Sequence, residues 1–464
     1  MMNEKSDNID ETEHRLMQVA CDVIFTQMYS KPELKKYAQM PAKQGMKIFG
    51  QAAVAAMIKE FSQLNQGAVP GKPVVVPVNV NTLTHLEKKK ALPAVNLIKE
   101  KRSGDIKGRT CVNGSKQRKY LKQDESVSSP TAGLESLVTT LLIDAYEQRD
   151  VAIFDIPGAF LQAKLKKNGN ERTLMKLEGD FVDIMCDINP EHKPNITYEN
   201  GKKTLYMEIM QAIYGCLESS LRWYEFYSET LKAEGYVINP YDKCVANKEI
   251  DKNQCTIIWY VDDNKVSHKD TKVVDDVLEM IRGHFGDITV SRGEEHTFLG
   301  MNIKVRKDKK IEIEMKDQLK ETIDMFETFE ENKIEEIVTS PAQKHLRECN
   351  DECPKLERRK HDLFHSIVAK LLWIMKRARP DLEVAVSYLC TRVSKSDEDD
   401  WKKLRRVLAF IQCTLGDIRI IGAENLTDIY TWVDAAYAVN PDMRSQTGGA
   451  ISMGTGVLHG RSGK

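Results

Sequence analysis

The feature that most constrains this chain is a pair of adjacent aspartates, Asp262 and Asp263, set between two apolar segments. Residues 254–268, QCTIIWYVDDNKVSH, predict an apolar strand, a turn at 261–264 and a second strand that starts at Lys265. Aspartate is common in solvated turns, but burying carboxylates is costly unless a cation offsets their charge. Apolar strands on both sides of the pair therefore favour a metal site over a plain turn.

A third carboxylate ends another apolar segment. Residues 150–165, DVAIFDIPGAFLQAKL, predict a buried strand that ends on Asp155 at a Pro-Gly turn. The three carboxylates can converge only if the two strands are neighbours in one sheet. Hard divalent cations such as Mg²⁺ take oxygen ligands, and two ions roughly 3.5–4 Å apart can align an attacking hydroxyl with a leaving pyrophosphate. The pattern is therefore typical of a polymerase.

Helix and strand patterns alternate along the rest of the chain. Apolar residues recur every three to four positions within residues 11–66, which predicts helix, and a connector rich in proline and glycine follows at 67–83. A helix pattern spans 134–149, and residues 205–236 begin as a strand and continue as a long amphipathic helix. Helices that alternate with mostly antiparallel strands predict an α+β fold.

Charge is balanced over the whole chain but not along it. The 68 Lys and Arg against 69 Asp and Glu exclude a globally basic nucleic-acid binder. Residues 99–122, however, hold nine basic side chains and two acidic ones, a net charge of +7, around the alternating segment 106–112. Turn signals at 103–105 and 113–114 predict a hairpin that projects basic side chains, with a solvated charged face as the alternative.

Cysteine usage and hydropathy bear on the compartment. The ten cysteines lack the dense spacing of a disulfide framework, which predicts a reduced, intracellular setting. The N-terminus has no apolar core of a secretory signal, and no apolar run approaches ~18 residues, so neither secretion nor a membrane span is expected. Cys349 and Cys353, with His345 and His361 nearby, could be zinc ligands, although no second ligand pair is spaced to match.

Six motifs occur in order along the chain. They are KGRTCVNG (107–114), SSPT (128–131), FDIPGAFLQA (154–163), QAIYGCLESSLRWYE (211–225), WYVDDNKVSH (259–268) and TFLGMNI (297–303). Together they resemble the reverse transcriptase of copia-type long-terminal-repeat retrotransposons. Residues 378–394 and 401–416 resemble the connection that follows such a polymerase, and residues 431–453 resemble the opening of a ribonuclease H domain.

The resemblance implies a right-hand polymerase with fingers, palm and thumb around an antiparallel palm sheet, followed by a connection region and an incomplete ribonuclease H-like start. The expected divisions are an N-terminal helical region (1–75), fingers, palm and thumb (76–340), the connection region (341–425) and a truncated ribonuclease H-like segment (426–464). The last segment is shorter than the ~40 residues that an independent core requires. We therefore expect no ribonuclease H activity from this chain.

The resemblance also implies roles for individual residues. Asp155, Asp262 and Asp263 would be the catalytic carboxylates that bind two Mg²⁺ ions, for which Mn²⁺ can substitute. Lys107 and Arg109 would grip the incoming triphosphate, because Arg forks onto phosphate oxygens and Lys acts as a point charge.

Further positions match the family around the nucleotide and the primer. Phe160 would exclude a ribose 2′-hydroxyl, with a core aromatic as the alternative. Tyr214 and Gly215 would lie against the nucleotide and template base, where glycine permits close approach of the backbone to substrate. Asp434 would be a vestigial first aspartate of a ribonuclease H site. Three consecutive residues would lie near the primer end: Phe298, Leu299 and Gly300.

Three positions depart from the family's pattern. Glu218 stands where relatives carry a basic or amide residue, and its carboxylate would repel template phosphates. Asn113 stands where lysine is frequent, and Pro157 could shift the loop after Asp155. None of these departures removes a carboxylate ligand.

The expected function is RNA-directed DNA synthesis, and the alternative is an inactive remnant that still binds nucleic acid. A P-loop NTPase is disfavoured because the chain has no GxxxxGK[ST] motif. The expected partners are an RNA template, a DNA primer and deoxynucleoside triphosphates, with a second copy of the chain or other retrotransposon polyprotein parts as protein partners. The expected location is the cytoplasm, in a virus-like particle, with a nuclear stage.

Overall fold

The computed structural model describes residues 39–69, 71–101, 103–120, 127–166, 172–349, 352–440 and 442–464. Within these limits the chain forms two compact units. The first unit comprises residues 134–153 and 292–464, and the second comprises residues 39–133 and 154–291. The predicted helix pattern at 11–38, and Arg102 and Lys122 of the basic segment, lie outside the described residues.

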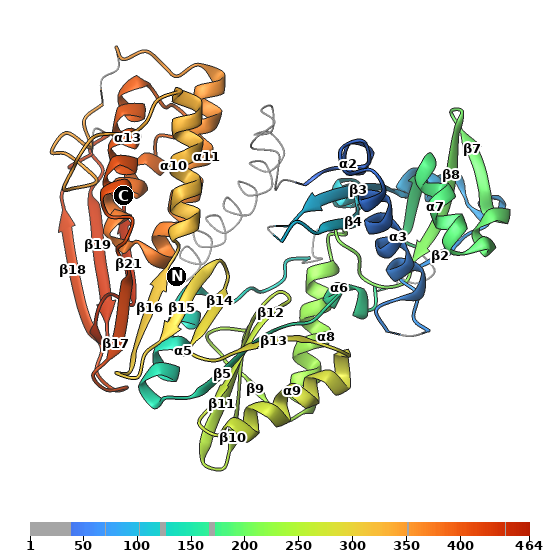
Figure 1. Cartoon of the computed structure of the whole chain (residues 1–464), viewed down its shortest axis with the longest axis horizontal. Helices are drawn as coiled ribbons and strands as arrows, with labels where there is room; N and C mark the ends of the chain where they lie inside the picture. Colours follow the sequence, from blue (N-terminus) through green and yellow to red (C-terminus); the bar gives the residue numbers. More distant parts are fainter. Residues whose placement is uncertain are drawn as a thin grey trace. The chain divides into compact units, whose positions relative to one another are not determined.

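The second unit contains a seven-stranded sheet (Figure 1). Its strands are β1 (Met40–Pro41), β2 (Val75–Pro77), β3 (Leu92–Glu100), β4 (Ile106–Val112), β6 (Leu174–Glu178), β7 (Ile196–Glu199) and β8 (Lys202–Ile209). Their order is β1-β3-β6-β8-β2, with β4 paired to β3 and β7 paired to β8. The pairs are antiparallel except for a short parallel match between β3 and β6.

Short and long helices accompany this sheet. They are α2 (Ala42–Phe49), α3 (Gln51–Gln66), α4 (His85–Lys90) and α7 (Asp180–Ile188), with 3₁₀ helices at Val80–Thr82, Gly114–Lys119 and Pro190–Asn195. α4 begins at a capping box, in which Thr84 and Glu87 each accept the other's backbone N–H. The boundary of this short helix is therefore encoded locally.

α3 packs its apolar face into the core of the seven-stranded sheet. Its buried residues are Ala53, Met57, Phe61 and Leu64, at the three-to-four-residue spacing that the sequence predicts. Phe61 packs edge-on against Phe181 of α7, with ring centroids 6.2 Å apart. The same core contains strands from the other side of the connector at 67–83. The predicted domain divisions stay predictions.

A six-stranded sheet has most of its residues in the second unit. Its strands are β5 (Asp150–Asp155), β9 (Val237–Ile238), β10 (Val245–Ile250), β11 (Asn253–Tyr260), β12 (Asp263–His268) and β13 (Thr289–Arg292), in the order β13-β5-β12-β11-β10-β9. β5 enters this unit with its last two residues, Phe154 and Asp155.

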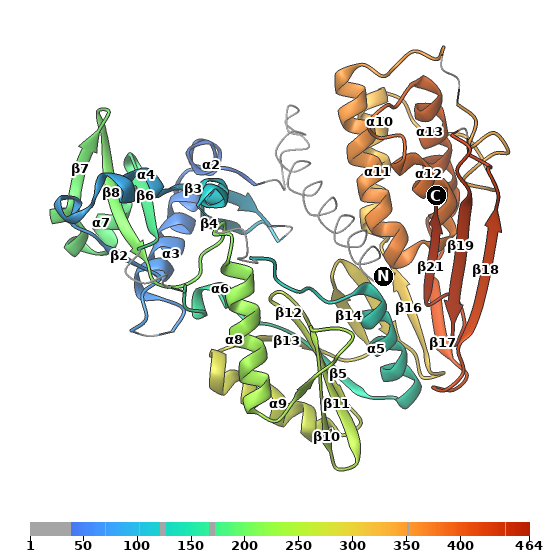
Figure 2. The same cartoon turned by 180° about the vertical axis from the view of Figure 1, so that it is seen from behind.

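Two long helices, α8 (Ser219–Ala233) and α9 (Thr271–Phe285), lie against the six-stranded sheet, near the short helix α6 (Ala159–Gln162) (Figures 1 and 2). Aromatic rings join these layers. Trp223 of α8 lies edge-on to Phe285 of α9 at 5.5 Å, and Tyr227 of α8 lies edge-on to Trp259 of β11 at 5.3 Å.

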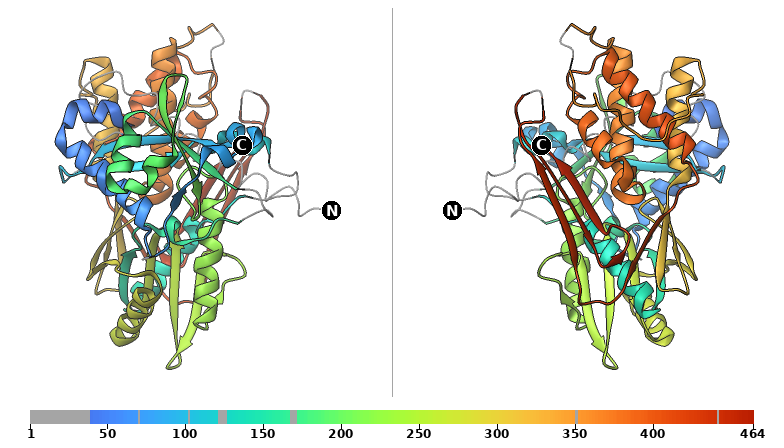
Figure 3. Two further views of the ribbon diagram at one scale, coloured as in Figure 1. Left: turned by 90° about the vertical axis from the view of Figure 1, so that its right-hand side faces the viewer. Right: turned by 90° about the vertical axis from the view of Figure 1, so that its left-hand side faces the viewer.

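The first unit combines helices with two antiparallel sheets (Figure 3). The helices are α5 (Leu134–Glu147), α10 (Lys316–Glu330), α11 (Arg358–Ala378), α12 (Glu383–Cys390) and α13 (Glu398–Cys413), with a 3₁₀ helix at Pro380–Leu382. One sheet has the order β14 (Glu295–Phe298), β15 (Met301–Val305), β16 (Lys310–Glu314), β17 (Arg419–Ala423), β20 (Gly454–Thr455). The other has the order β18 (Tyr430–Ala436), β19 (Gln446–Ser452), β21 (His459–Gly463).

These elements confirm the predicted α+β fold with antiparallel sheets. The basic segment forms the hairpin of β3 and β4, where Gly104 has φ +85° and the Ser103 hydroxyl donates to Asp105 at 2.8 Å. Over the described residues, no helix combines the length and apolar character needed to cross a membrane.

Candidate active site

Asp262 and Asp263 lie at the tip of the β11–β12 hairpin. Tyr260 pairs with Asp263 across the hairpin, so Val261 and Asp262 form the turn. Val261 has φ +62°, a conformation that β-branched residues rarely adopt. β5 is the sheet neighbour of β12, and Asp155 ends β5 in a position accessible to solvent. The two strands are therefore neighbours in one sheet, as the convergence of the carboxylates requires.

Two side chains hold the strained turn. The indole N–H of Trp223 donates to the carbonyl oxygen of Val261 at 2.6 Å, and the side-chain amide of Asn264 donates to the carbonyl oxygen of Asp262 at 2.5 Å. Trp223 is buried and stacks on Tyr227 with centroids 5.3 Å apart. The aromatic core of α8 therefore anchors the backbone that carries the carboxylates.

Burial and neighbouring charge raise the pKa of two of these carboxyl groups, Asp155 and Asp263. Partial burial, and then the charges of Asp262 and Asp155, raise the pKa of Asp263 to about 6. Partial burial and the charge of Asp262 also raise the pKa of Asp155, whereas Lys107 lowers it. Negative charge is thus concentrated at these strand ends, where a cation would relieve it.

This donor set fits a divalent metal ion that substrate helps to hold. Mg²⁺ prefers oxygen ligands and often binds through one or two carboxylates together with substrate phosphates. Among the described residues, no group of three or more Asp, Glu, His or Cys side chains is arranged to hold a metal ion by itself. The binding of two ions by Asp155, Asp262 and Asp263 stays a prediction.

Basic and aromatic side chains lie beside the carboxylates. The guanidinium of Arg109 on β4 lies over the ring of Tyr214, 4.6 Å from its centroid. The rings of Tyr214 and Phe160 have centroids 4.9 Å apart. Burial, and then the charges of Arg109 and Lys101, lower the pKa of Lys107, against the opposing effect of Glu60 and Asp155. The predicted nucleotide-site residues all belong to the second unit: Lys107, Arg109, Phe160, Tyr214 and Gly215.

Contacts within the chain require glycine at position 215. It has φ +93°, and a Cβ added there would lie 2.0 Å from the carbonyl oxygen of Val112. The N–H of Val112 donates to the carbonyl oxygen of Tyr214 at 2.8 Å. A Cβ added to Gly114 would lie 2.1 Å from the carbonyl oxygen of Gly215. Gly215 thus permits a close approach to the end of β4, and its approach to substrate stays a prediction.

The rings of Tyr214 and Phe160 differ in how deeply they are buried. Burial, and then the charge of Asp262, raise the pKa of Tyr214 to about 12, so its hydroxyl stays protonated near neutral pH. Phe160 follows the left-handed Gly158 at the start of α6 and is only partly buried. Its ring is therefore partly exposed, and its role in excluding a ribose 2′-hydroxyl stays a prediction.

The family model described as "Reverse transcriptase (RNA-dependent DNA polymerase)" matches residues 79–339, more than half of the 464 residues. The chain belongs to this reverse transcriptase family. Members of the family generally use divalent metal ions, in keeping with the acidic strand ends. The matched range contains Asp155, Asp262 and Asp263, together with the predicted nucleotide-site positions.

Two curated relatives extend the likeness to the expected retrotransposon class. The chain is 24% identical over 391 residues to the "Retrovirus-related Pol polyprotein from transposon TNT 1-94" of Nicotiana tabacum, covering 81% of this chain and 27% of that one. It is 23% identical over 352 residues to the corresponding polyprotein from transposon RE2 of Arabidopsis thaliana, covering 74% and 22%. The chain thus spans about a quarter of the length of these relatives, and the predicted copia-type resemblance is confirmed.

A solved structure also aligns with this chain. It is the foamy viral protease-reverse transcriptase in complex with double-stranded DNA, with 11% sequence identity and a TM-score of 0.46. The alignment covers 91% of this chain and 68% of that one.

The predicted primer-end residues form a tight hairpin in the first unit. Leu299 and Gly300 have φ +47° and +77°, which matches a two-residue turn between β14 and β15. A Cβ on Gly300 would lie 2.4 Å from the ring of Trp373 on α11, and the side chain of Gln318 donates to the Gly300 carbonyl oxygen at 2.8 Å. Phe298 is buried. The three residues thus form a strand turn, and their role at the primer stays a prediction.

Asp434 belongs to the first unit and is exposed on β18, where its carboxylate accepts the N–H of Ala435 at 2.9 Å. The departures from the family pattern have local partners. Glu218 accepts the Nε–H of Arg222 at 2.8 Å, which offsets the charge expected to repel a template. Asn113 caps the 3₁₀ helix after β4 by accepting the N–H of Ser115 at 3.1 Å.

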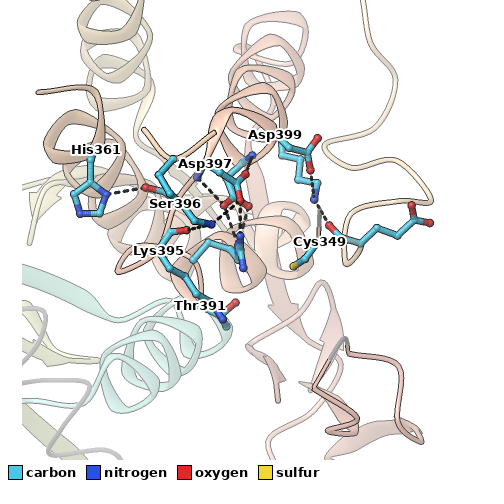
Figure 4. A network of polar contacts seen from close by, with 12 residues as sticks. Cys349, His361, Thr391, Lys395, Ser396, Asp397 and Asp399 are labelled. Carbon is cyan, nitrogen blue, oxygen red and sulfur yellow. Dashed lines mark hydrogen bonds and ion pairs between the residues drawn. The ribbon is translucent and has the colours of Figure 1, made fainter. Parts of the chain in front are cut away.

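The side chains with zinc-like spacing make other contacts. Nδ1 of His361 lies 2.8 Å from the Ser396 hydroxyl (Figure 4). Sγ of Cys349 lies 3.3 Å from the Tyr388 hydroxyl. Across the described ranges no metal-holding cluster includes them.

Sequence reasoning missed two residues of this region, Glu60 and Trp223. Glu60 accepts the backbone N–H of Thr110 on β4 at 2.7 Å. Its signal was an acidic residue at the i+3 position after Met57, on the apolar face of a predicted helix. Trp223 gave no comparable signal, because its apolar ring fits a helix core whether or not its N–H has a partner.

Proposed function

We propose that this chain is an RNA-directed DNA polymerase, which transfers a deoxynucleotide onto the 3′-hydroxyl of a primer paired with an RNA template. The observation that carries the proposal is the acidic end of the six-stranded sheet, where the hairpin tip with Asp262 and Asp263 belongs to the strand beside β5, which ends on Asp155. Membership of the reverse transcriptase family supports the same reaction.

Each group would act through position and charge. Asp155, Asp262 and Asp263 would bind two Mg²⁺ ions, which favour deprotonation of the primer hydroxyl and neutralise the triphosphate when bound. Arg109, oriented by the Tyr214 ring, and Lys107 would bind phosphate oxygens. Phe160, packed against Tyr214, would leave no room for a ribose 2′-hydroxyl. Electrostatic stabilisation and positioning supply most of the rate in such transfers.

Nucleic acid would be the macromolecular partner, held through its phosphates. The β3–β4 hairpin and the residues after it carry most of the basic segment at 99–122. Contacts between these cations and phosphates release counterions, so template binding should weaken steeply as salt rises. The proposed site of action is the cytoplasmic virus-like particle, with deoxynucleoside triphosphates as the small-molecule substrates.

The test is incorporation of labelled deoxythymidine triphosphate on a poly-rA template with an oligo-dT primer and Mg²⁺. We expect Asp262→Asn to abolish incorporation, because the amide removes a negative ligand and leaves the fold of the turn intact. Asp276→Asn is the matched control, since Asp276 is exposed on α9 of the same unit.

Either outcome is informative. Incorporation that survives in Asp276→Asn and is lost in Asp262→Asn supports the polymerase. If the unmodified chain incorporates nothing yet binds the template with salt-sensitive affinity, the chain is an inactive nucleic-acid-binding remnant and the proposal is wrong.

A further inference from the structure

The outer edge of β4 is held by groups from two other segments. β4 hydrogen-bonds to β3 along one side. Along its other side, the N–H of Val112 donates to the carbonyl oxygen of Tyr214 at 2.8 Å, and the N–H of Thr110 donates to the Glu60 carboxylate at 2.7 Å. A side-chain carboxylate thus takes the place that a neighbouring strand would occupy.

α3 brings Glu60 to this edge by close packing. A Cβ added to Gly108 would lie 2.7 Å from the carbonyl oxygen of Ala56 and 3.1 Å from Sδ of Met57. Helix and strand can therefore approach this closely only because residue 108 is glycine. Glu60 follows Met57 by three residues, one turn further along the same helix face.

The hydrogen bond from Thr110 to Glu60 is made next to the two predicted phosphate-binding cations, because Thr110 directly follows Arg109 on β4. Side chains alternate along a strand, so Lys107 and Arg109 project to one face while the Thr110 side chain projects to the other, where its hydroxyl donates to Asn96 at 3.0 Å. Fixing the backbone at Thr110 also fixes where the Arg109 guanidinium meets the Tyr214 ring. Burial raises the pKa of Glu60, while the Thr110 N–H, Arg109 and Lys107 oppose this effect.

We propose that Glu60 is a positioning residue for the incoming triphosphate: its carboxylate holds β4 at Thr110, so that Arg109 and Lys107 are presented to the phosphates in a fixed register. The inference rests on the polymerase function proposed above. It assigns a part in nucleotide binding to α3, which lies before the family-matched residues 79–339.

Two conservative substitutions separate the hydrogen bond from the charge. Glu60→Asp keeps the charge but is one methylene shorter and cannot reach Thr110, whereas Glu60→Gln keeps the length and an acceptor oxygen but has no charge. We expect Glu60→Asp to raise the KM for the nucleotide about five- to tenfold with kcat changed less than about twofold, and Glu60→Gln to stay near the unmodified chain. Lys59→Ala, on the exposed side of the same helix, is the control.

A second readout needs no catalysis. Hydrogen exchange of the segment 106–112, followed by mass spectrometry without nucleotide, should be faster in Glu60→Asp than in Glu60→Gln or Lys59→Ala. Unchanged KM and unchanged exchange in Glu60→Asp would overturn the proposal. So would an equal rise of KM in both glutamate variants, or a loss of kcat as large as the rise of KM. If the unmodified chain incorporates no nucleotide, the polymerase proposal fails, while the exchange experiment still decides whether Glu60 holds β4.

Discussion

Val261 illustrates how single residues set the geometry of the carboxylates. A β-branched residue at φ +62° stores strain of about 1–3 kcal/mol, which the surroundings must offset. The antiparallel pairing on both sides and the Trp223 N–H provide this offset. The motif therefore depends on a tryptophan 38 residues away in sequence.

We predict that Trp223→Phe lowers kcat, because the phenyl ring fills the core but leaves the Val261 carbonyl oxygen without its donor. The loss of such a hydrogen bond costs about 1–3 kcal/mol, or roughly five- to 150-fold in rate if the whole effect falls on the turn. Glycine adopts positive φ without strain, so Trp223→Phe should lower kcat less in a Val261→Gly background. Incorporation rates of the four combinations measure this coupling.

The control for this cycle is Trp401→Phe in the first unit. Trp401 is similarly buried, and its indole N–H has no hydrogen-bond partner among the described residues. Its replacement should leave incorporation nearly unchanged. Equal effects of Trp223→Phe in both backgrounds would show that the tryptophan contributes only to the core.

At the scale of elements, α13 shows how a helix start can be tied to its neighbours. Asp397 and Asp400 form a capping box at its N-terminus. Both carboxylates also bind the buried Arg392 after α12, with Nε of Arg392 2.9 and 3.0 Å from Asp400 and its Nη2 2.8 Å from Asp397 (Figure 4). The charged residues at this helix start therefore serve packing, and Trp401 and Leu404 of the same helix are buried.

We predict that Arg392→Gln lowers the free energy of unfolding of the first unit by about 3–5 kcal/mol, because the buried Asp400 loses its cation and the buried Asp397 keeps only the more exposed Lys355. Urea denaturation followed by tryptophan fluorescence measures the change. Arg405→Gln is the matched control, since Arg405 is more exposed and pairs with Glu336 on the surface, where a salt bridge contributes about 0–1 kcal/mol. Comparable losses in the two variants would contradict the assignment.

At the scale of the whole molecule, the C-terminal segment is bound into the first unit despite its short length. β20 pairs with β17, and the buried Arg419 donates to the carbonyl oxygens of Val457 and Leu458 at 2.8 Å. Nδ1 of His459 lies 2.9 Å from the Glu135 carboxylate on α5. The C-terminal segment therefore shares a sheet with β17.

The Glu135–His459 contact predicts a pH dependence of the first unit. The hydrogen bond to His459 lowers the pKa of Glu135 to about 2. A depressed carboxyl pKa contributes stability above the unfolded value of 4.5, and this contribution is lost as pH falls toward 2. Because the pair is partly exposed, we expect about 1 kcal/mol or less.

Urea denaturation at pH 5, 4 and 3 tests this dependence. Glu135→Gln should be less stable than the unmodified chain at pH 5, and the difference should shrink as the pH is lowered. Glu335→Gln, at an exposed position of the same unit, should show no such convergence. A constant difference for Glu135→Gln at all three pH values would rule the contact out as its cause.

Local patterns were sufficient for the elements and for the identity of the acidic positions. An apolar run broken by a turn predicted β11 and β12, the three-to-four-residue period predicted α3, and turn residues predicted the β3–β4 hairpin, because each depends on interactions within a few residues. Ordered motifs were then enough to indicate the family.

Only the tertiary structure decided which distant groups support those positions. Glu60 at Thr110, Trp223 at Val261 and the approach of Gly215 to Val112 join residues that are 38 to 103 positions apart, so no local period reports them. A side chain on an apolar helix face looks the same in sequence whether it fills a core or holds a backbone group. The sequence determined which residues carry charge and which strands carry them; packing determined what holds them in place, because hydrogen bonds and close contacts depend on distance in space rather than along the chain.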